Sequence, residues 1–227
     1  MGYTIEQIRT RLDDLSVNMS LLYKDDCINY IGKTTDTKEY YTEVIAEWLL
    51  EHIDLFEEIK PITRKSSYRM SGHDGIPDNP HSNRTEELIA MAIMRQGTLP
   101  LVGQILDYQT PLKNVRKDKA GKIDLLAYDG KTLRILELKE PDSDETMLRC
   151  VLEGYTYLKT ADTAKLLADF ELPADTVVEA CPFVFKGGFQ WEEMQQERPY
   201  LKKLMDIIGT KPYYIIEENK EYFETEE

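Results

Sequence analysis

The segment GKIDLLAYDGKTLRILELK, residues 121–139, decides the fold of this chain. Two runs rich in apolar residues, 122–128 and 132–139, flank the dipeptide Asp129-Gly130. Asp-Gly between two such runs is the strongest short signal for a β-hairpin, because both residues tolerate the positive φ of a tight turn. The sequence therefore predicts two antiparallel strands that are neighbours in a sheet.

Three charged residues lie in this predicted hairpin. Glu137 and Lys139 are two positions apart in one strand, so their side chains point to the same face. Their neighbours are apolar, and a charge buried on such a strand must be paired or must bind something. Asp124 lies five residues before Asp129, and Glu137 seven after Gly130. A strand register that brings the two carboxylates together is feasible.

Two carboxylates placed together repel each other unless a cation lies between them. Mg²⁺ or Mn²⁺ suits such a pair, since Mg²⁺ takes one or two carboxylates and keeps several waters. Lys139 could then orient or deprotonate an attacking water and stabilise developing charge. Two simpler interpretations stay open. Glu137 and Lys139 could form a salt bridge on a solvated sheet face, and Asp124 could serve turn chemistry at the strand end.

Outward from the hairpin, helices and strands alternate. Apolar spacing predicts N-terminal helices over 4–23 and 38–58 and a first strand over 102–109. The stretch 61–83, rich in Pro, Gly and Ser, reads as a long loop with few apolar anchors, and we expect it to be mobile. The remaining predictions are helices at 84–96, 144–160 and 191–208, and strands at 176–185 and 212–217.

Asp124, the hairpin and Glu137-Leu-Lys139, in the order helix, three strands, helix, strand, resemble the PD-(D/E)XK nuclease superfamily. The resemblance covers about residues 83–185. It implies that Asp124 and Glu137 bind the metal and that Lys139 serves catalysis. One departure is Ile123, which precedes Asp124 where the family pattern has Pro.

The resemblance also implies an acidic metal ligand on the helix before the first strand. Glu86 and Glu87 are the candidates. Glu86 has an alternative role as the capping-box partner of Asn83, which makes Glu87 the slightly preferred ligand. On the helix after the lysine, many members carry Gln-x-x-x-Tyr, and the nearest match here is Glu153 with Tyr157, Glu replacing Gln. Core packing is the alternative role for Tyr157.

The fold expected from these features is α/β with a restriction-endonuclease-like core. Its mixed sheet begins as an antiparallel three-strand meander, continues with further strands and is flanked by helices. Residues 1–60 are expected to form an N-terminal helical extension packed on the core. Residues 61–227 form the nuclease-like domain, which ends in an acidic tail expected to be a solvated, frayed terminus.

The net charge of −14 argues against binding nucleic acid over the whole surface, because phosphate contacts need Lys and Arg. Residues 60–122 are different, with eleven Lys and Arg against six Asp and Glu. Basic residues around the predicted site are therefore candidates for phosphate contacts, although a solvated hairpin end explains the 113–122 group equally well. These candidates are Arg64, Lys65, Arg84, Lys113, Arg116, Lys117, Lys119 and Lys122.

The sequence points to a Mg²⁺-dependent nuclease that hydrolyses phosphodiester bonds, with DNA as the expected partner. A non-catalytic nuclease-fold module that binds a protein partner is the main alternative and would suit the acidic surface. An unrelated α/β enzyme acting on a small substrate is a third possibility, and a homodimer is possible in each case. The three cysteines are widely spaced and no apolar run approaches a membrane span, so we expect a cytoplasmic protein.

Overall fold

The computed structural model describes residues 1–227 except residues 1, 80, 116–117, 119 and 220–221. In the described part of the chain, seven strands form one sheet whose order follows the sequence. The first four strands pair antiparallel, the next two join in parallel, and the last returns antiparallel. The strands are β1 (Thr98–Leu99), β2 (Gly103–Pro111), β3 (Lys122–Tyr128), β4 (Thr132–Leu138), β5 (Val177–Phe185), β6 (Tyr213–Asn219) and β7 (Tyr222–Glu226).

The predicted hairpin is confirmed, with β3 and β4 antiparallel on either side of Asp129-Gly130. Gly130 has a φ of 97°, a conformation that glycine adopts without the strain a Cβ would add. Asp129 Oδ1 accepts hydrogen bonds from the N–H groups of Lys131 and Thr132. Local chemistry therefore fixes the turn, and the turn fixes the strand register.

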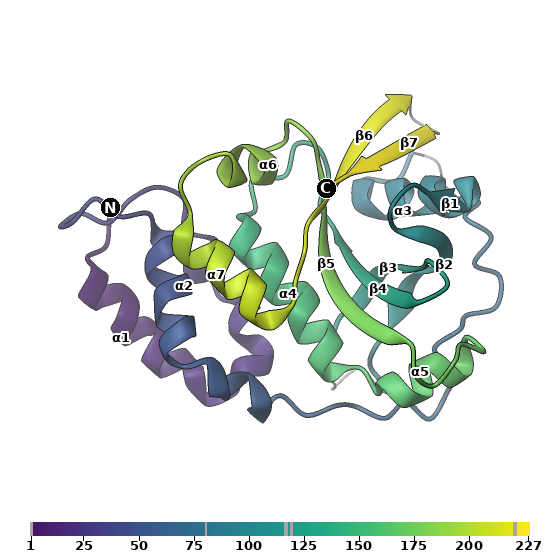
Figure 1. The fold of residues 1–227 in the computed structure, drawn as a ribbon, viewed down its shortest axis with the longest axis horizontal. Coiled ribbons are helices and arrows are strands. Elements are labelled where there is room, and N and C mark those ends of the chain that lie inside the picture. Colours follow the sequence, from purple (N-terminus) through teal and green to yellow (C-terminus); the bar gives the residue numbers. More distant parts are fainter. Residues whose placement is uncertain (1, 80, 116–117, 119, 220–221) are drawn as a thin grey trace.

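Helices cover both faces of the sheet (Figure 1). Successive residues of β3 and β4 point to opposite faces, as the pleat requires. Leu126 and Ile135 join the core that α4 covers, whereas Leu125 and Leu136 join the core that α3 covers. The α-helices are α1 (Ile5–Leu15), α2 (Tyr41–Glu51), α3 (Thr85–Gln96), α4 (Met147–Thr160), α5 (Thr163–Asp169), α6 (Phe189–Met194) and α7 (Pro199–Ile208).

The N-terminal segment is helical, but its α-helices are shorter than predicted. After α1, the 3-10 helix η1 (Ser16–Lys24) replaces the rest of the predicted helix 4–23, and a second 3-10 helix, η2 (Asp26–Asn29), follows it. The predicted helix 38–58 begins only at α2, because Lys38 has a φ of 65° and Tyr40 bridges back to Lys33. It continues after His52 as η3 (Ile53–Glu58). The apolar faces of these helices share one core with α4.

The C-terminal region differs from its prediction in two ways. The predicted helix 191–208 is divided into α6 and α7, and Pro199 occupies the first turn of α7, where a missing N–H costs nothing. The expectation of a frayed acidic tail is wrong, because β6 and β7 form a hairpin. In β7, Phe223 and Thr225 are buried while Glu224 between them is exposed. This alternation holds the acidic segment on the fold.

The two edges of the sheet approach each other, so the sheet curls towards a closed barrel. The side-chain amide of Gln96, at the end of α3, bonds to both the N–H and the carbonyl of Phe223 in β7. The hydroxyl of Thr225 donates to the carbonyl of Pro100, beside β1. These contacts occupy part of each edge, which limits pairing with other chains there.

The long loop 61–83 has anchors that its composition did not reveal, the most buried being Tyr68. Tyr68 is fully buried; its N–H donates to Asp169, and its hydroxyl accepts the N–H of Asp162. Most other described residues of the loop are exposed. The structure thus ties the loop to α5 at Tyr68, and Arg64 and His73 add contacts to Lys113 and Asp107.

The protein is an α/β fold with a mixed seven-stranded sheet flanked by helices, counted over the described residues. Among those residues, no helix combines the length and apolar character needed to cross a membrane. Cys27, Cys150 and Cys181 are all buried free thiols.

Candidate functional site

Asp124 and Glu137 lie on one face of the sheet, at the open end of the hairpin, where β3 begins and β4 ends. The ladder pairs Leu125 with Leu136, and the next step along both strands is Asp124 and Glu137. Residues that face each other across neighbouring strands point to the same side. Asp124 Oδ2 accepts the N–H of Leu138 at 3.0 Å, which ties the carboxylate to β4. The hairpin register therefore brings the two acids together.

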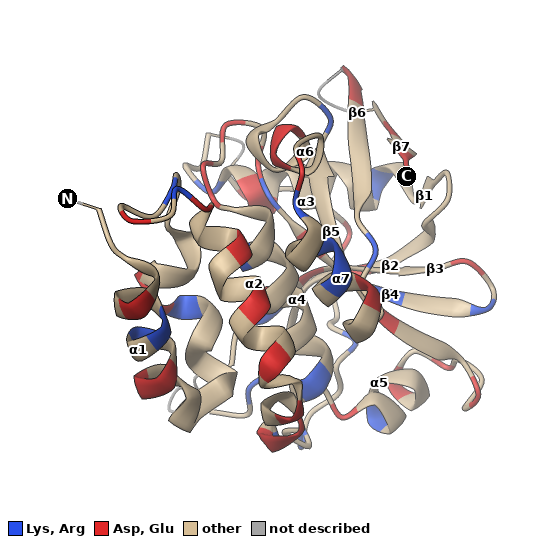
Figure 2. Cartoon of the chain, turned by 60° about the vertical axis from the view of Figure 1, so that its left-hand side comes forward, with Lys and Arg blue, Asp and Glu red and all other residues tan. Residues whose placement is uncertain are grey.

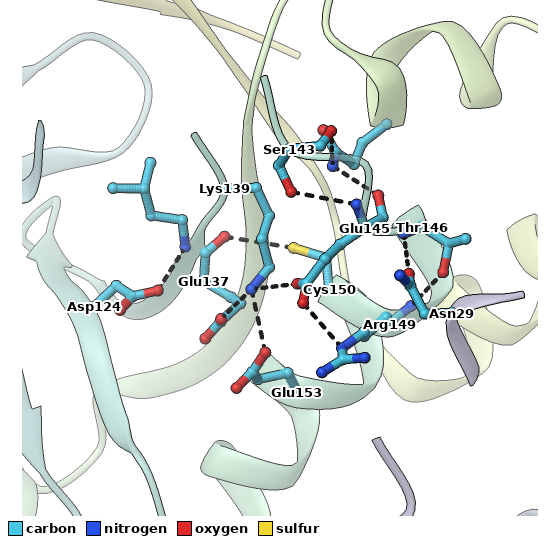
Figure 3. A network of polar contacts seen from close by, with 12 residues as sticks. Asn29, Asp124, Glu137, Lys139, Ser143, Glu145, Thr146, Arg149, Cys150 and Glu153 are labelled. Atoms are coloured by element: carbon cyan, nitrogen blue, oxygen red, sulfur yellow. Dashed lines mark hydrogen bonds and ion pairs between the residues drawn. The ribbon is translucent and has the colours of Figure 1, made fainter. Parts of the chain in front are cut away.

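Lys139 lies inside a cluster of three carboxylates (Figure 3). Its Nζ is 2.9 Å from Glu137 Oε1, 2.9 Å from Glu145 Oε2 and 3.2 Å from Glu153 Oε2. Glu137 is 3% and Lys139 4% exposed, so they form the salt bridge of the simpler interpretation, but it is buried and not on a solvated sheet face. Arg149 Nε adds a second cation, 3.1 Å from Glu145 Oε1.

Burial shifts the pKa values of this cluster. It raises the pKa of Asp124 to about 7; Lys139 opposes that shift and Glu86 adds to it. Burial, followed by repulsion from Asp124, also holds the pKa of Glu137 well above its ordinary value. Burial would lower the pKa of Lys139, but Glu137 and Glu153 raise it well above the usual range. Lys139 is therefore an ammonium at neutral pH, able to orient a ligand or stabilise an anion.

The donor set fits a hard divalent cation. Glu137 Oε2 is buried and, among the described residues, has no hydrogen-bond partner. An unpartnered buried oxygen is costly, and a cation would satisfy it. The described residues contain no group of three or more His, Cys, Asp or Glu side chains arranged to hold a metal. Asp124 and Glu137 are two carboxylates, which is enough for Mg²⁺ when water supplies the other ligands.

Of the two candidate acidic residues on α3, Glu86 and not Glu87 is the one whose charge acts on this cluster. The helix begins after Arg84, and the described residues provide no side-chain cap there, so the capping-box role of Glu86 is wrong. Glu86 is half-buried, and its charge raises the pKa of Asp124. Glu87 instead pairs with Arg84 at 3.1 Å. This arrangement favours Glu86 as the third acidic residue, against the order expected from the sequence.

Helix α4 holds Lys139 in place through Glu153. Tyr157 donates its hydroxyl to Glu153 Oε1 at 2.7 Å, and Glu153 Oε2 accepts from Lys139. Burial opposes ionisation of Glu153, but Lys139 and the Tyr157 hydroxyl hold its pKa below the ordinary value. Tyr157 is also 6% exposed, so it both packs in the core and directs Glu153. Gly154 allows the close approach of helix and strand, because a Cβ there would lie 3.3 Å from the Glu137 Cβ.

Gly121 provides a test of this support. A Cβ at Gly121 would lie 2.1 Å from the Tyr157 hydroxyl oxygen. We expect Gly121→Ala to displace the ring, break its bond to Glu153 and lower stability by about 1–3 kcal/mol. Denaturant unfolding of Gly121→Ala, Tyr157→Phe and the double variant measures this. The two effects should be strongly non-additive, since they act through one contact; additive effects would contradict the arrangement.

The Asp124 carboxylate opens onto a cleft of about 610 Å³ between the start of α3 and the loop that follows β4. Carboxylates dominate its described lining, with seven acidic side chains against two basic ones. Polar groups supply most of the rest: Asn83, Thr85, Gln109 and Ser143. The charged side chains are Glu86, Glu87, Asp124, Glu140, Asp142, Asp144 and Glu145, facing Arg84 and Lys122.

Apart from Arg64, the predicted phosphate-binding residues separate into three groups. Arg84 and Lys122 line the cleft. Lys65 is exposed and Lys113 half-buried; neither is among the cleft-lining residues, and the backbone N–H of Lys65 is tied to the Asn114 side chain. Predictions for three other residues lie outside the described part of the chain: Arg116, Lys117 and Lys119.

Arg64 is used inside the fold, so the structure does not support its predicted phosphate contact. It is 7% exposed, and its guanidinium donates to the carbonyls of Lys113 and Ser67. The same group lies 5.5 Å from the centre of the Tyr68 ring. Arg64 thus joins the long loop to the β2–β3 connection.

Three residues of the network were not predicted from the sequence. Glu145 and Arg149 neutralise one another beside Lys139, and Gln109 Nε2 donates to Asp124 Oδ1 at 2.9 Å. The i, i+4 spacing of Glu145 and Arg149 indicates a helix-surface pair, but it does not indicate their lysine neighbour. Gln109 carries no sequence signal for its contact.

No family model, curated protein or solved structure matches this chain.

Proposed function

We propose that this protein is a metal-dependent phosphodiesterase that cleaves nucleic acid, with DNA as the first substrate to test. The observation that carries the proposal is the pairing of Asp124 with Glu137 on one sheet face, beside the buried ammonium of Lys139. The order of helix α3, the β2–β4 meander, helix α4 and parallel β5 supports a restriction-endonuclease-like core. Strands β6 and β7 extend the sheet beyond that core and are an addition to it.

In this proposal Asp124 and Glu137 hold Mg²⁺, and Glu86 adds negative charge beside them. When bound, the ion would polarise the scissile phosphate and lower the pKa of a coordinated water. Lys139 positions the attacking water and stabilises negative charge on the phosphate as an ammonium; its raised pKa argues against a role as general base. Glu153 and Glu145 keep the ammonium in place, and Tyr157 keeps Glu153 in place.

The charges that line the cleft determine how a polyanion such as DNA would bind there. Arg84 and Lys122 are the described basic residues of the lining, and they provide the phosphate contacts. The opposite wall, 140–145, would repel a phosphate backbone. We therefore expect cleavage to depend strongly on the divalent cation, which offsets that repulsion, and to weaken only modestly with salt, because two basic contacts release few counterions.

The test is incubation of the purified protein with single- and double-stranded DNA and RNA in Mg²⁺, in Mn²⁺ and with a chelator. Cleavage is expected with either ion and none with the chelator. Lys159→Ala is a matched control, since it removes a lysine whose ion pair with Glu57 is at the surface, away from the site. The control should cleave like the wild type.

A second candidate function rests on the same cleft. Seven carboxylates against two basic side chains, among the described lining residues, favour a basic segment of a protein partner over nucleic acid. Elsewhere, Asp and Glu are the charged residues along α2, whereas α1 carries both signs (Figure 2). Absence of cleavage in every condition above, together with binding of an Arg- and Lys-rich peptide that Glu140→Lys weakens, would support this module and contradict the nuclease.

A further inference from the structure

Strand β2 is irregular where it passes Asp124. Gln109 has a φ of 49°, although it lies within a strand and is not glycine. A residue with a Cβ rarely adopts this conformation, and it persists only where the surrounding structure holds it. Such residues cluster at functional sites, where the strain is retained for what it positions.

The structure around Gln109 holds this conformation from the N-terminal side. The β2–β3 register shifts between Ile105 and Asp107, as in a β-bulge, which redirects the side chains that follow. Asp107 is 1% exposed; its Oδ1 accepts the N–H of Tyr108 at 2.8 Å and lies 2.6 Å from His73 Nδ1. The His73 ring stacks on Tyr108. The long loop thus fixes the backbone immediately before Gln109.

The side chain of Gln109 is directed at one atom. Tyr108 pairs with Leu125 and Thr110 with Ile123, so Gln109 stands opposite Asp124 in the register. Its Nε2 donates to Asp124 Oδ1 at 2.9 Å. Asp124 Oδ2 accepts from the backbone of β4, so each oxygen of the carboxylate is held by a different neighbouring strand.

We propose that Gln109 is a positioning residue, whose strained backbone directs its amide at Asp124 so that this carboxylate keeps one orientation for the metal. The inference rests on the proposed function, because it assumes that Asp124 binds a divalent cation. A hydrogen-bonded ligand does not have to be ordered when the ion binds, and loss of such a partner typically weakens metal binding about 10–100-fold.

The experiment measures Mn²⁺ affinity by calorimetry and metal-free thermal unfolding for Gln109→Leu and Gln109→Gly. Leucine removes the amide and keeps a Cβ in the strained conformation. Glycine removes the amide and also relieves the strain. Both variants should bind Mn²⁺ about 10–100-fold more weakly than the wild type. Gln109→Gly should unfold at a higher temperature than Gln109→Leu.

Leu101→Gly is the matched control, because Leu101 has a φ of 64° and is 51% exposed. It should gain thermal stability and leave Mn²⁺ affinity unchanged. Wild-type affinity in either Gln109 variant would overturn the inference while leaving the proposed function standing. Absence of Mn²⁺ binding by the wild type would overturn both, and a Gln109→Gly protein no more stable than Gln109→Leu would overturn the role of strain.

Discussion

Glu137→Gln is expected to abolish metal-dependent cleavage and to leave the fold intact. Gln keeps the shape of the side chain but removes a charged metal ligand, so Mg²⁺ affinity should fall with activity. Because burial and Asp124 already raise the pKa of Glu137, a neutral side chain is tolerated there, and thermal stability should change little. Calorimetric titration with Mn²⁺ and thermal unfolding separate the two effects.

Lys139 is expected to respond differently from Glu137. Lys139→Ala should lower turnover about 10²–10³-fold, the range of a lost charge-stabilising group, and leave metal binding largely intact. It also leaves three carboxylates without their ammonium, which should cost about 3–5 kcal/mol of stability. Lys139→Arg, which keeps the charge, should regain most of that stability. Equal stability losses for Glu137→Gln and Lys139→Ala, with no change in metal titration, would reduce the pair to a structural salt bridge.

Asp124→Asn is expected to stabilise the metal-free protein at high pH. Burial raises the pKa of Asp124 from its ordinary 3.8 to about 7, so the native state holds a proton that the unfolded chain has lost. Stability from this group is therefore fully present below about pH 4 and is lost as the pH rises to about 7. The gap corresponds to at most about 4 kcal/mol. Asn removes the penalty, and the Gln109 amide can turn to accept from it.

Denaturant unfolding of Asp124→Asn between pH 4 and pH 8, with and without Mg²⁺, tests this expectation. The variant should match the wild type at pH 4, exceed it at pH 8 with a chelator, and lack its stabilisation by Mg²⁺. Asp129→Asn is a control of opposite sign. Burial would raise the pKa of Asp129, but hydrogen bonds from Thr132 N–H and Arg134 hold it below the ordinary value. The Asp129→Asn variant should be less stable than the wild type at pH 8. If Asp124→Asn were also less stable at pH 8, Asp124 would not be a carboxylate that burial destabilises and a cation stabilises.

Local chemistry accounts for the parts of the fold and site that were predictable. The hairpin could be predicted from Asp129-Gly130, since the turn and the two apolar runs beside it are close together in the sequence. The common face of Glu137 and Lys139 followed from the two-residue period of a strand. The helix bounds were less accurate, because apolar spacing does not encode a turn such as the one at Lys38, which the positive φ of Lys38 and the Lys33–Tyr40 bridge form.

The acidic tail shows why composition alone misleads. Six glutamates after Tyr214 suggested a solvated end, yet Phe223 at 2% exposure anchors a hairpin whose edge is covered by α3. Arg64 is a parallel case: its basic charge suggested a phosphate contact, whereas tertiary contacts place two backbone carbonyls around it. In both, the side chain's role was decided by which partners lay within reach.

By itself, the sequence determined the hairpin, the position of Asp124, Glu137 and Lys139 in it, and the order of helices around the sheet. Only the tertiary structure decided which other residues join this site. Glu145, from the loop after β4, reaches Lys139, and Gln109 holds Asp124. Of the two glutamates on α3, it is Glu86 whose charge acts on Asp124. The physical reason is one of range. Turn chemistry and strand period act between residues a few positions apart, whereas the charges and amides around a buried cluster are selected by the packing of distant elements.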